Sequence, residues 1–387
     1  MDAYFSDRAL ALAPPVKRAA YSDRTAWLMA EISRLVYELL PCELNTQATV
    51  ASIVEKIKAA VAKGDYEDVA MAVIEEARQR GAPTASIVET TLREANFELL
   101  DSFSIGGTQA LLCRLNKTGA CEGMLVLAFR GTQKSYDDIV SDIEADLVSA
   151  PLGGRIHRGF LDAYRLVETQ IGASLQQYAG LPVYITGHSL GAALAVVATR
   201  YLDSDSTGAT YTFGCPRAAD DVFYESVKTP VYRVVNAADG VPRVPFGYGM
   251  MILLSLIQLI PVKGVTAVAK FIRQHFGGYT HYGDLVFLSA ADNVVGDDGI
   301  LFAKLDVRHS PNFFWVASQV LPRWIATRGK AVATDHYILE YSQKLLAYAQ
   351  RRSRVSGQNP KVPETVPMRP PASAVSPVTA GDSPTPK

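Results

Sequence analysis

Residues 183–198 read VYITGHSLGAALAVVA, and this stretch decides the fold. Val183–Thr186 is rich in β-branched and aromatic side chains, which predicts a short buried strand. Ala192–Ala198 is a run of helix-forming residues. Gly187-His188-Ser189-Leu190-Gly191 lies between them and fits the pattern G-x-S-x-G. The stretch therefore predicts a strand, a sharp turn and a helix, with a serine on the turn.

A serine in this position is suited to nucleophilic attack. Its hydroxyl is exposed on the turn, and the two glycines let the strand and helix approach where side chains would clash. The following helix presents its positive dipole end, and the Leu190 N–H can point at a developing oxyanion. The alternative is an inert serine in a glycine-flanked turn. We predict that Ser189 is the nucleophile and that Leu190 is an oxyanion donor.

Strand-like and helix-like segments alternate on both sides of this turn. Three strand-like segments separated by Gly and Asn turns come before it: Phe97–Ile105, Ala110–Leu115 and Met124–Phe129. After it come the helix Gly191–Leu202, the strand Tyr211–Phe213, the helix Asp220–Val227 and the strand Val231–Val235. Such alternation predicts the α/β class, with a mostly parallel sheet covered by helices on its faces.

The chain divides into three predicted regions. Residues 1–95 are expected to be a helical N-terminal region, with amphipathic helices at Thr25–Leu40, Thr46–Ala62 and Tyr66–Gln79. Residues 96–352 are expected to form the catalytic domain. Residues 353–387 contain 8 of the 21 prolines, and their only large aliphatic side chains are valines. Such a composition buries too little apolar surface to fold, so a disordered Pro-rich tail is expected.

Overall composition excludes some classes of protein. The chain has 387 residues, a net charge of −1 and 48% hydrophobic residues, which gives ample material for a large core. The nearly neutral charge argues against a nucleic-acid binder, since such proteins usually carry a basic face. Residues 250–262 (MMILLSLIQLIPV) are strongly apolar but are too few to span a bilayer, which takes about 20 residues.

Cysteine usage and the start of the chain suggest a reducing compartment. Cys42, Cys113, Cys121 and Cys215 form no C-x-x-C pair and are too few for a disulfide framework. Cys113 and Cys121 can face each other across a predicted hairpin, but small buried thiols are favoured. Residues 1–17 lack the charged and apolar segments of a secretory signal. We expect a cytoplasmic location, with leaderless secretion or peripheral membrane association left open.

The acid partner of Ser189 is expected after it in the chain, followed by a histidine. Asp239 comes just after the predicted strand Val231–Val235, in the segment Asn236-Ala237-Ala238-Asp239-Gly240. A loop at the carboxyl end of a strand is where α/β sheets place site residues. An ordinary turn aspartate before glycine is the alternative. Among the other acids after Ser189, Asp203 and Asp205 lie in a helix-exit loop and Asp220 and Asp221 start a helix, so Asp239 is favoured.

Four histidines follow Asp239, and two of them are candidates for the base. His275 ends a predicted apolar helix, and His309 lies in a polar turn before Pro311. His281 opens the strand Leu285–Leu288, and His336 follows Asp335 at the start of another helix. Both lie on turns at element boundaries, so spacing alone leaves His281 and His336 equally favoured.

Several motifs together resemble the class 3 (fungal-type) triacylglycerol lipases of the α/β-hydrolase fold. They occur in the family's order over about residues 96–345: Phe129-Arg130-Gly131-Thr132, Ile156-His157-Arg158-Gly159-Phe160, Gly187–Gly191, Thr212-Phe213-Gly214-Cys215-Pro216-Arg217, Arg233-Val234-Val235-Asn236, Asp239 with Val241-Pro242, Tyr279–Gly283, and Asp335-His336. The resemblance implies a triad of Ser189, Asp239 and His336, and makes His281 a non-catalytic residue.

The resemblance also implies further parts of the site. Thr132 matches the second oxyanion donor of the family, and residues 135–147 occupy the position of the lid helix. An apolar stripe opposite an acidic face in 135–147 fits a lid and fits an ordinary surface helix equally well. Residues 248–272 depart from the family's pattern as a longer, apolar insertion after Asp239, and we expect a second lid, a lipid-facing anchor or core packing.

The predicted function is a serine carboxylester hydrolase of lipid esters, with triacylglycerol lipase favoured. The chemistry needs no metal or cofactor. The expected partner is a lipid ester substrate, with contact to a membrane or lipid droplet surface. No nucleic acid is expected and no protein partner is identifiable. Alternatives are a phospholipase A, a short-chain esterase, a leaderless lipid-hydrolysing effector, and a catalytically inactive binding module.

Overall fold

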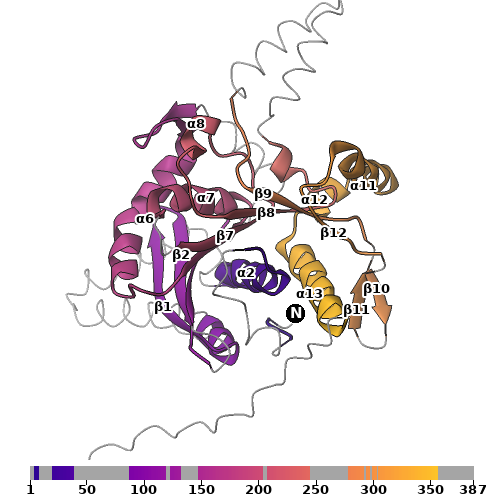
Figure 1. Cartoon of the computed structure of the whole chain (residues 1–387), viewed down its shortest axis with the longest axis horizontal. Coiled ribbons are helices and arrows are strands. Elements are labelled where there is room, and N and C mark those ends of the chain that lie inside the picture. Colours follow the sequence, from indigo (N-terminus) through magenta and orange to yellow (C-terminus); the bar gives the residue numbers. More distant parts are fainter. Residues whose placement is uncertain are drawn as a thin grey trace, which may run out of the picture.

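The computed structural model describes residues 4–7, 20–38, 87–118, 123–131, 147–203, 207–244, 278–291, 293–296, 299–302 and 304–355. Its centre is an eight-stranded sheet in the order β1-β2-β3-β6-β7-β8-β9-β12 (Figure 1). The strands are β1 (Phe97–Ile105), β2 (Thr108–Leu115), β3 (Met124–Phe129), β6 (Val183–His188), β7 (Thr207–Phe213), β8 (Val231–Asn236), β9 (Asp284–Leu288) and β12 (Val307–His309).

The middle of this sheet is parallel and its two ends are antiparallel. Strands β3, β6, β7, β8 and β9 run parallel to one another, while β1 and β2 at one end of the sheet and β12 at the other pair antiparallel. The carboxyl ends of β6 and β8 therefore lie at the same edge, where α/β sheets place their sites. The predicted α/β-hydrolase fold, with a mostly parallel central sheet, is confirmed.

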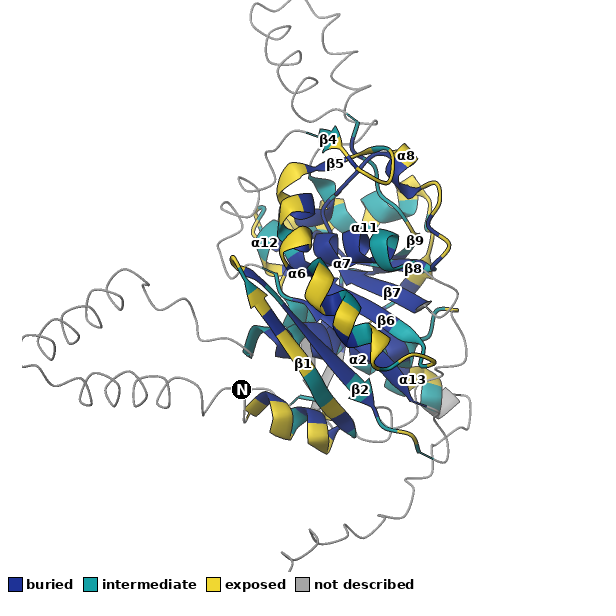
Figure 2. Ribbon diagram, turned by 90° about the vertical axis from the view of Figure 1, so that its left-hand side faces the viewer, coloured by how far each residue is buried: buried dark blue, intermediate teal, exposed yellow. Residues whose placement is uncertain are grey.

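Helices cover both faces of the sheet. The side chains of β3 alternate: Val126 packs with α2 (Asp23–Leu35) and α13 (Ile338–Val355) on one face. Leu127 packs with α6 (Arg158–Gln176) and α7 (Leu190–Leu202) on the other. This period of two is that of a strand buried on both sides. Strands β6 and β7 are accordingly coloured as buried along most of their length in Figure 2.

One helix of the predicted N-terminal region belongs to this same core. Helix α2 begins after Ser22, whose hydroxyl accepts from the Thr25 N–H, and Trp27 is fully buried against the sheet. The Glu31 carboxylate, also buried, accepts hydrogen bonds from the Phe5 N–H and the Ser342 hydroxyl of α13. The boundary at residue 95 remains a prediction, but α2 packs as part of the layer that covers the sheet.

Shorter elements complete the described chain. They are η1 (Val36–Glu38), β4 (Leu147–Ser149), β5 (Arg155–His157), α8 (Asp221–Tyr224), η2 (Val241–Arg243), β10 (Asn293–Gly296), β11 (Gly299–Phe302), α11 (Phe313–Ala326) and α12 (Ala331–Thr334). Helix α8 is shorter than the predicted Asp220–Val227, and His309 ends strand β12 rather than lying in a turn. Among the described residues, no helix has the length and apolar character needed to cross a membrane.

Some predicted features lie outside the described residues. They are the helices at 46–62 and 66–79, Thr132, the lid-like segment except its last residue, the apolar insertion 248–272, and nearly all of the tail at 353–387. Cys42 and Cys121 also lie outside them, while Cys113 and Cys215 are free and buried. Burial raises the pKa of the Cys215 thiol to about 12, so this thiol is inert at neutral pH.

Candidate active site

Ser189 lies on a sharp turn between β6 and α7. Its backbone has φ 58° and ψ −128°, a conformation that a residue with a side chain rarely adopts. A Cβ at Gly187 would lie 2.3 Å from the Gly191 oxygen, and one at Gly191 would lie 2.4 Å from the Phe129 oxygen. Both flanking positions therefore require glycine, which is the physical reason for the G-x-S-x-G spacing.

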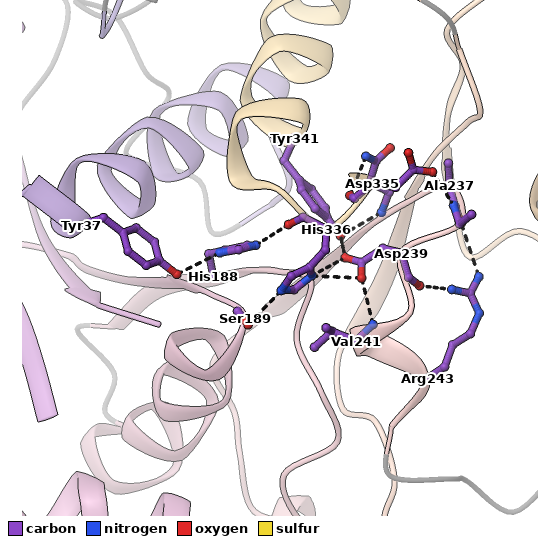
Figure 3. A network of polar contacts seen from close by, with 12 residues as sticks. Tyr37, His188, Ser189, Ala237, Asp239, Val241, Arg243, Asp335, His336 and Tyr341 are labelled. Atoms are coloured by element: carbon purple, nitrogen blue, oxygen red, sulfur yellow. Dashed lines mark hydrogen bonds and ion pairs between the residues drawn. The ribbon is translucent and has the colours of Figure 1, made fainter. Parts of the chain in front are cut away.

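The structure brings Ser189, His336 and Asp239 together from three separate segments (Figure 3). His336 Nε2 lies 2.9 Å from the Ser189 Oγ, and His336 Nδ1 lies 3.0 Å from both carboxylate oxygens of Asp239. Ser189 follows β6, Asp239 follows β8, and His336 lies between α12 and α13. This chain of contacts is the geometry of a serine nucleophile, a general base and an orienting acid.

Asp239 is fully buried and is held as a carboxylate by its neighbours. Its Oδ2 accepts from the Tyr341 hydroxyl, and its Oδ1 accepts from the Val241 N–H at 2.9 Å. Burial is the largest influence and acts to raise the pKa of Asp239. His336 and the hydrogen bonds from His336, Tyr341 and Val241 outweigh it together and hold that pKa below its ordinary value. The acid therefore stays ionised, as an imidazolium partner must.

The other candidate base, His281, is placed elsewhere. Its Nε2 lies 2.6 Å from the Pro242 carbonyl oxygen, whereas the contacts to Ser189 and Asp239 are made by His336. Burial, followed by the positive charges of Arg233 and Arg217, holds the pKa of His281 well below its ordinary range. Of the two histidines that spacing left open, the geometry brings only His336 between the serine and the acid.

Asp335 fixes the position of its neighbour His336. The Asp335 carboxylate accepts two hydrogen bonds from the Arg323 guanidinium of α11, at 2.7 and 2.6 Å, and one from the Ala238 N–H at 3.0 Å. The Asn236 side chain donates to the Asp335 carbonyl at 2.9 Å. These contacts tie the histidine segment to the loop that carries Asp239.

His188, the variable residue before the serine, is a second positioning group. Its Nε2 donates to the His336 carbonyl oxygen at 2.6 Å, and its Nδ1 lies 3.0 Å from the Tyr37 hydroxyl of η1. Burial, together with repulsion from His336, lowers the pKa of His188 to about 3. A neutral ring with one donor and one acceptor nitrogen fits these two partners, with Tyr37 donating to Nδ1.

These supporting residues were not found from the sequence. The motif leaves the position of His188 free, Tyr37 falls in the predicted N-terminal region, and Tyr341 falls in a helix with no motif of its own. The one available signal was a histidine directly beside the nucleophile. The partners of Tyr341 and Asp335 depend on packing between distant segments, which periodicity does not reveal.

The oxyanion side of the site is described in part. Leu190 begins α7, so its N–H has no partner within the helix and lies next to Ser189. Gly131, the residue before Thr132, lies against the turn: a Cβ on it would be 2.5 Å from the His188 oxygen and 3.3 Å from the Ser189 Cβ. The chain at Gly131 therefore leaves β3 directly beside the nucleophile, and Thr132 lies outside the described residues. Within the described residues no cluster of His, Cys, Asp or Glu has the arrangement of a metal site.

Comparison with known proteins agrees with this class of site. Residues 126–249 match the family described as lipase (class 3). The chain is 33% identical over 159 residues to a lipase of Rhizomucor miehei, which covers 36% of this chain and 42% of that protein. It is 40% identical over 114 residues to a secreted mono- and diacylglycerol lipase of Fusarium solani, which covers 27% of this chain and 33% of that protein. The resemblance to the class 3 lipases is confirmed.

The matched part is limited in extent. The aligned region spans less than half the length of these curated relatives. Among solved structures, lipase II from Rhizopus niveus is 21% identical with a TM-score of 0.40, covering 57% of this chain and 75% of that chain. The matched residues contain Ser189 and Asp239 but not His336, so the position of the base rests on the geometry described above.

Proposed function

We propose that this protein is a serine carboxylic ester hydrolase that acts on acylglycerols, with Ser189, His336 and Asp239 as its triad. The observation that carries the proposal is the continuous path of contacts from the Ser189 Oγ through His336 to the buried Asp239 carboxylate. The match to class 3 lipases supports a lipid ester as substrate.

The reaction begins with attack of the Ser189 Oγ on the ester carbonyl carbon. His336 Nε2 takes the hydroxyl proton, while Asp239 orients the ring through Nδ1 and stabilises the imidazolium. The carbonyl oxygen becomes an oxyanion, which accepts a hydrogen bond from the Leu190 N–H and, by resemblance, from Thr132.

Collapse of this intermediate breaks the ester bond. The alkoxide leaves with the proton from His336, so the alcohol departs neutral and the acyl group stays on Ser189. A water molecule then gives a proton to His336 and attacks the acyl carbon. The second intermediate releases a fatty acid and returns the proton to Ser189.

A series of esters of increasing chain length tests this proposal, with emulsified triacylglycerol as its last member and Ser189→Ala as the control. We expect hydrolysis that rises above the solubility limit of the substrate and is lost in Ser189→Ala. Turnover confined to soluble short esters would show that the protein is a short-chain esterase and not a lipase. No turnover of any ester by the wild-type protein would contradict the whole proposal.

A further inference from the structure

Helix α11 turns its apolar side outward. Six of the ten large hydrophobic side chains that are exposed among the described residues lie between positions 313 and 337: Phe313, Phe314, Leu321, Trp324, Ile325 and Tyr337. Phe313 and Phe314 are 77% and 82% exposed, and no residue of α11 is buried. The other four exposed hydrophobic side chains are scattered over the molecule, as is usual for a protein surface.

The five exposed side chains of α11 share one face. At about 100° per residue, Phe313, Trp324, Leu321, Phe314 and Ile325 fall within an arc of about 120°. The opposite side of the helix holds it to the protein: the Trp315 ring lies edge-on to Phe287, and Arg323 binds Asp335. An ordinary surface helix would bury its apolar face, so the orientation of α11 is inverted.

Two cations lie at the end of this face. Of the four basic residues in 307–334, Arg308 pairs with Asp306 and Arg323 pairs with Asp335, while Arg328 and Lys330 follow the last turn of α11. Arg328 and Lys330 are exposed at the end of the helix that carries the apolar face. An apolar face with cations at its border is suited to a lipid–water interface that bears negative charge, because the side chains enter the acyl layer while the cations meet the headgroups.

The α11 face is also tied directly to the active site. Helix α11 lies at the edge of the molecule beside α12, in the segment that leads to His336 (Figure 1). Arg323 connects the inner side of α11 to Asp335, and Tyr337, the residue after His336, is 64% exposed. A surface that meets α11 therefore meets the segment that carries the base.

We propose that the outward face of α11 docks the protein onto an anionic phospholipid surface, beside its own active site. The inference rests on the proposed function, because it names the surface from which that site would draw its substrate. The α11 face consists of Phe313, Phe314, Leu321, Trp324 and Ile325, with Arg328 and Lys330 at its border.

Vesicle binding tests the docking without any chemistry. The protein carries Ser189→Ala so that the lipid stays intact, and binding is measured by co-sedimentation with phosphatidylcholine vesicles that contain or lack phosphatidylglycerol. We expect Phe313→Ser with Phe314→Ser to weaken binding about 10- to 100-fold, since two exposed aromatic side chains would no longer enter the acyl layer. The matched control is Val222→Ser on α8, which is 54% exposed outside the α11 face and should bind like the parent.

Tryptophan fluorescence gives a second readout. Brominated lipid should quench the emission of Trp324, and Trp324→Phe should remove most of that quenching, because Trp27 is fully buried in the core and Trp315 packs against Phe287 on the opposite side of α11. Unchanged vesicle binding by the double variant, or equal binding to neutral and anionic vesicles, would overturn the proposal. A shift of the double variant to a smaller species in size-exclusion chromatography would also overturn the proposal. It would mean that a second copy of the chain, and not a lipid surface, covers the α11 face.

Hydrolysis of a soluble short ester separates this inference from the proposed function. The double variant without the Ser189 substitution should hydrolyse it at the wild-type rate, because Phe313 and Phe314 contact no member of the triad. Ester turnover without vesicle binding would overturn the docking alone. Vesicle binding by a wild-type protein that turns over no ester would overturn the function and leave the docking in place.

Discussion

Gly214 offers the sharpest test of how tightly the triad is packed. Its φ is +59°, and a Cβ built on it would lie 2.9 Å from the Asp239 Oδ2 and 2.9 Å from the His336 Nδ1 and Cε1. Gly214→Ala therefore adds a methyl group about 0.5 Å inside ordinary contact distance with both residues at once. One of them must move, and a misplacement of about 1 Å at a reacting group costs about 100-fold in rate.

Gly153→Ala is the matched control for this substitution. Gly153 has φ +93° and nothing within 4 Å of a built Cβ, so it shares the backbone strain but not the clash. Both variants should lose about 1 kcal/mol of unfolding free energy from the left-handed backbone. In addition, Gly214→Ala should lower kcat on a soluble ester about tenfold or more with little change in KM. A Gly214→Ala protein with wild-type kcat would refute the packing described here.

Two further predictions concern the groups around the triad. Tyr341→Phe removes the hydroxyl that donates to Asp239 and should cost about 1.5–3 kcal/mol of stability, because a buried carboxylate loses a hydrogen bond. This bond helps to hold the pKa of Asp239 below its ordinary value, so the stability difference between wild type and variant in urea unfolding should be full at pH 7 and should shrink as the pH falls below about 4. In the folded protein His188 stays neutral down to about pH 3, whereas in the unfolded chain the same side chain binds a proton below about pH 6.5. His188 therefore adds nothing to the free energy of unfolding at pH 7 and lowers it as the pH falls. From pH 7 to pH 5 that loss is about 2 kcal/mol, and urea unfolding of His188→Gln at both values should show a pH dependence smaller by about this amount. A stabilising effect of Tyr341→Phe, or an unchanged pH dependence in His188→Gln, would contradict the respective assignment.

The strand–turn–helix around Ser189 and the class of fold were predictable because their signals are local. The change from a strand period to a helix period and the two glycines occur within 16 residues, and the structure shows why those glycines are needed. Asp239 was favoured for a similar reason, since a position after a strand implies a position at the edge of the sheet.

The base and its supports were not predictable in this way. His281 and His336 both lie on turns, and only contacts between distant segments separate them. An amphipathic pattern shows that α2 has an apolar face but does not show that this face covers β6. The same kind of pattern does not show whether the apolar face of α11 points inward or outward. Such choices depend on the packing of the whole chain.

The central claim is that Ser189 is a nucleophile activated by His336, and covalent labelling with a fluorophosphonate tests it most directly. Peptide mapping should place the adduct on Ser189 in the wild-type protein, with the same labelling rate in Val222→Ser. Labelling should disappear in Ser189→Ala and slow by at least about 100-fold in His336→Ala, since the hydroxyl then lacks its base. A wild-type protein that stays unlabelled, or a His336→Ala protein that labels at the wild-type rate, would contradict the claim.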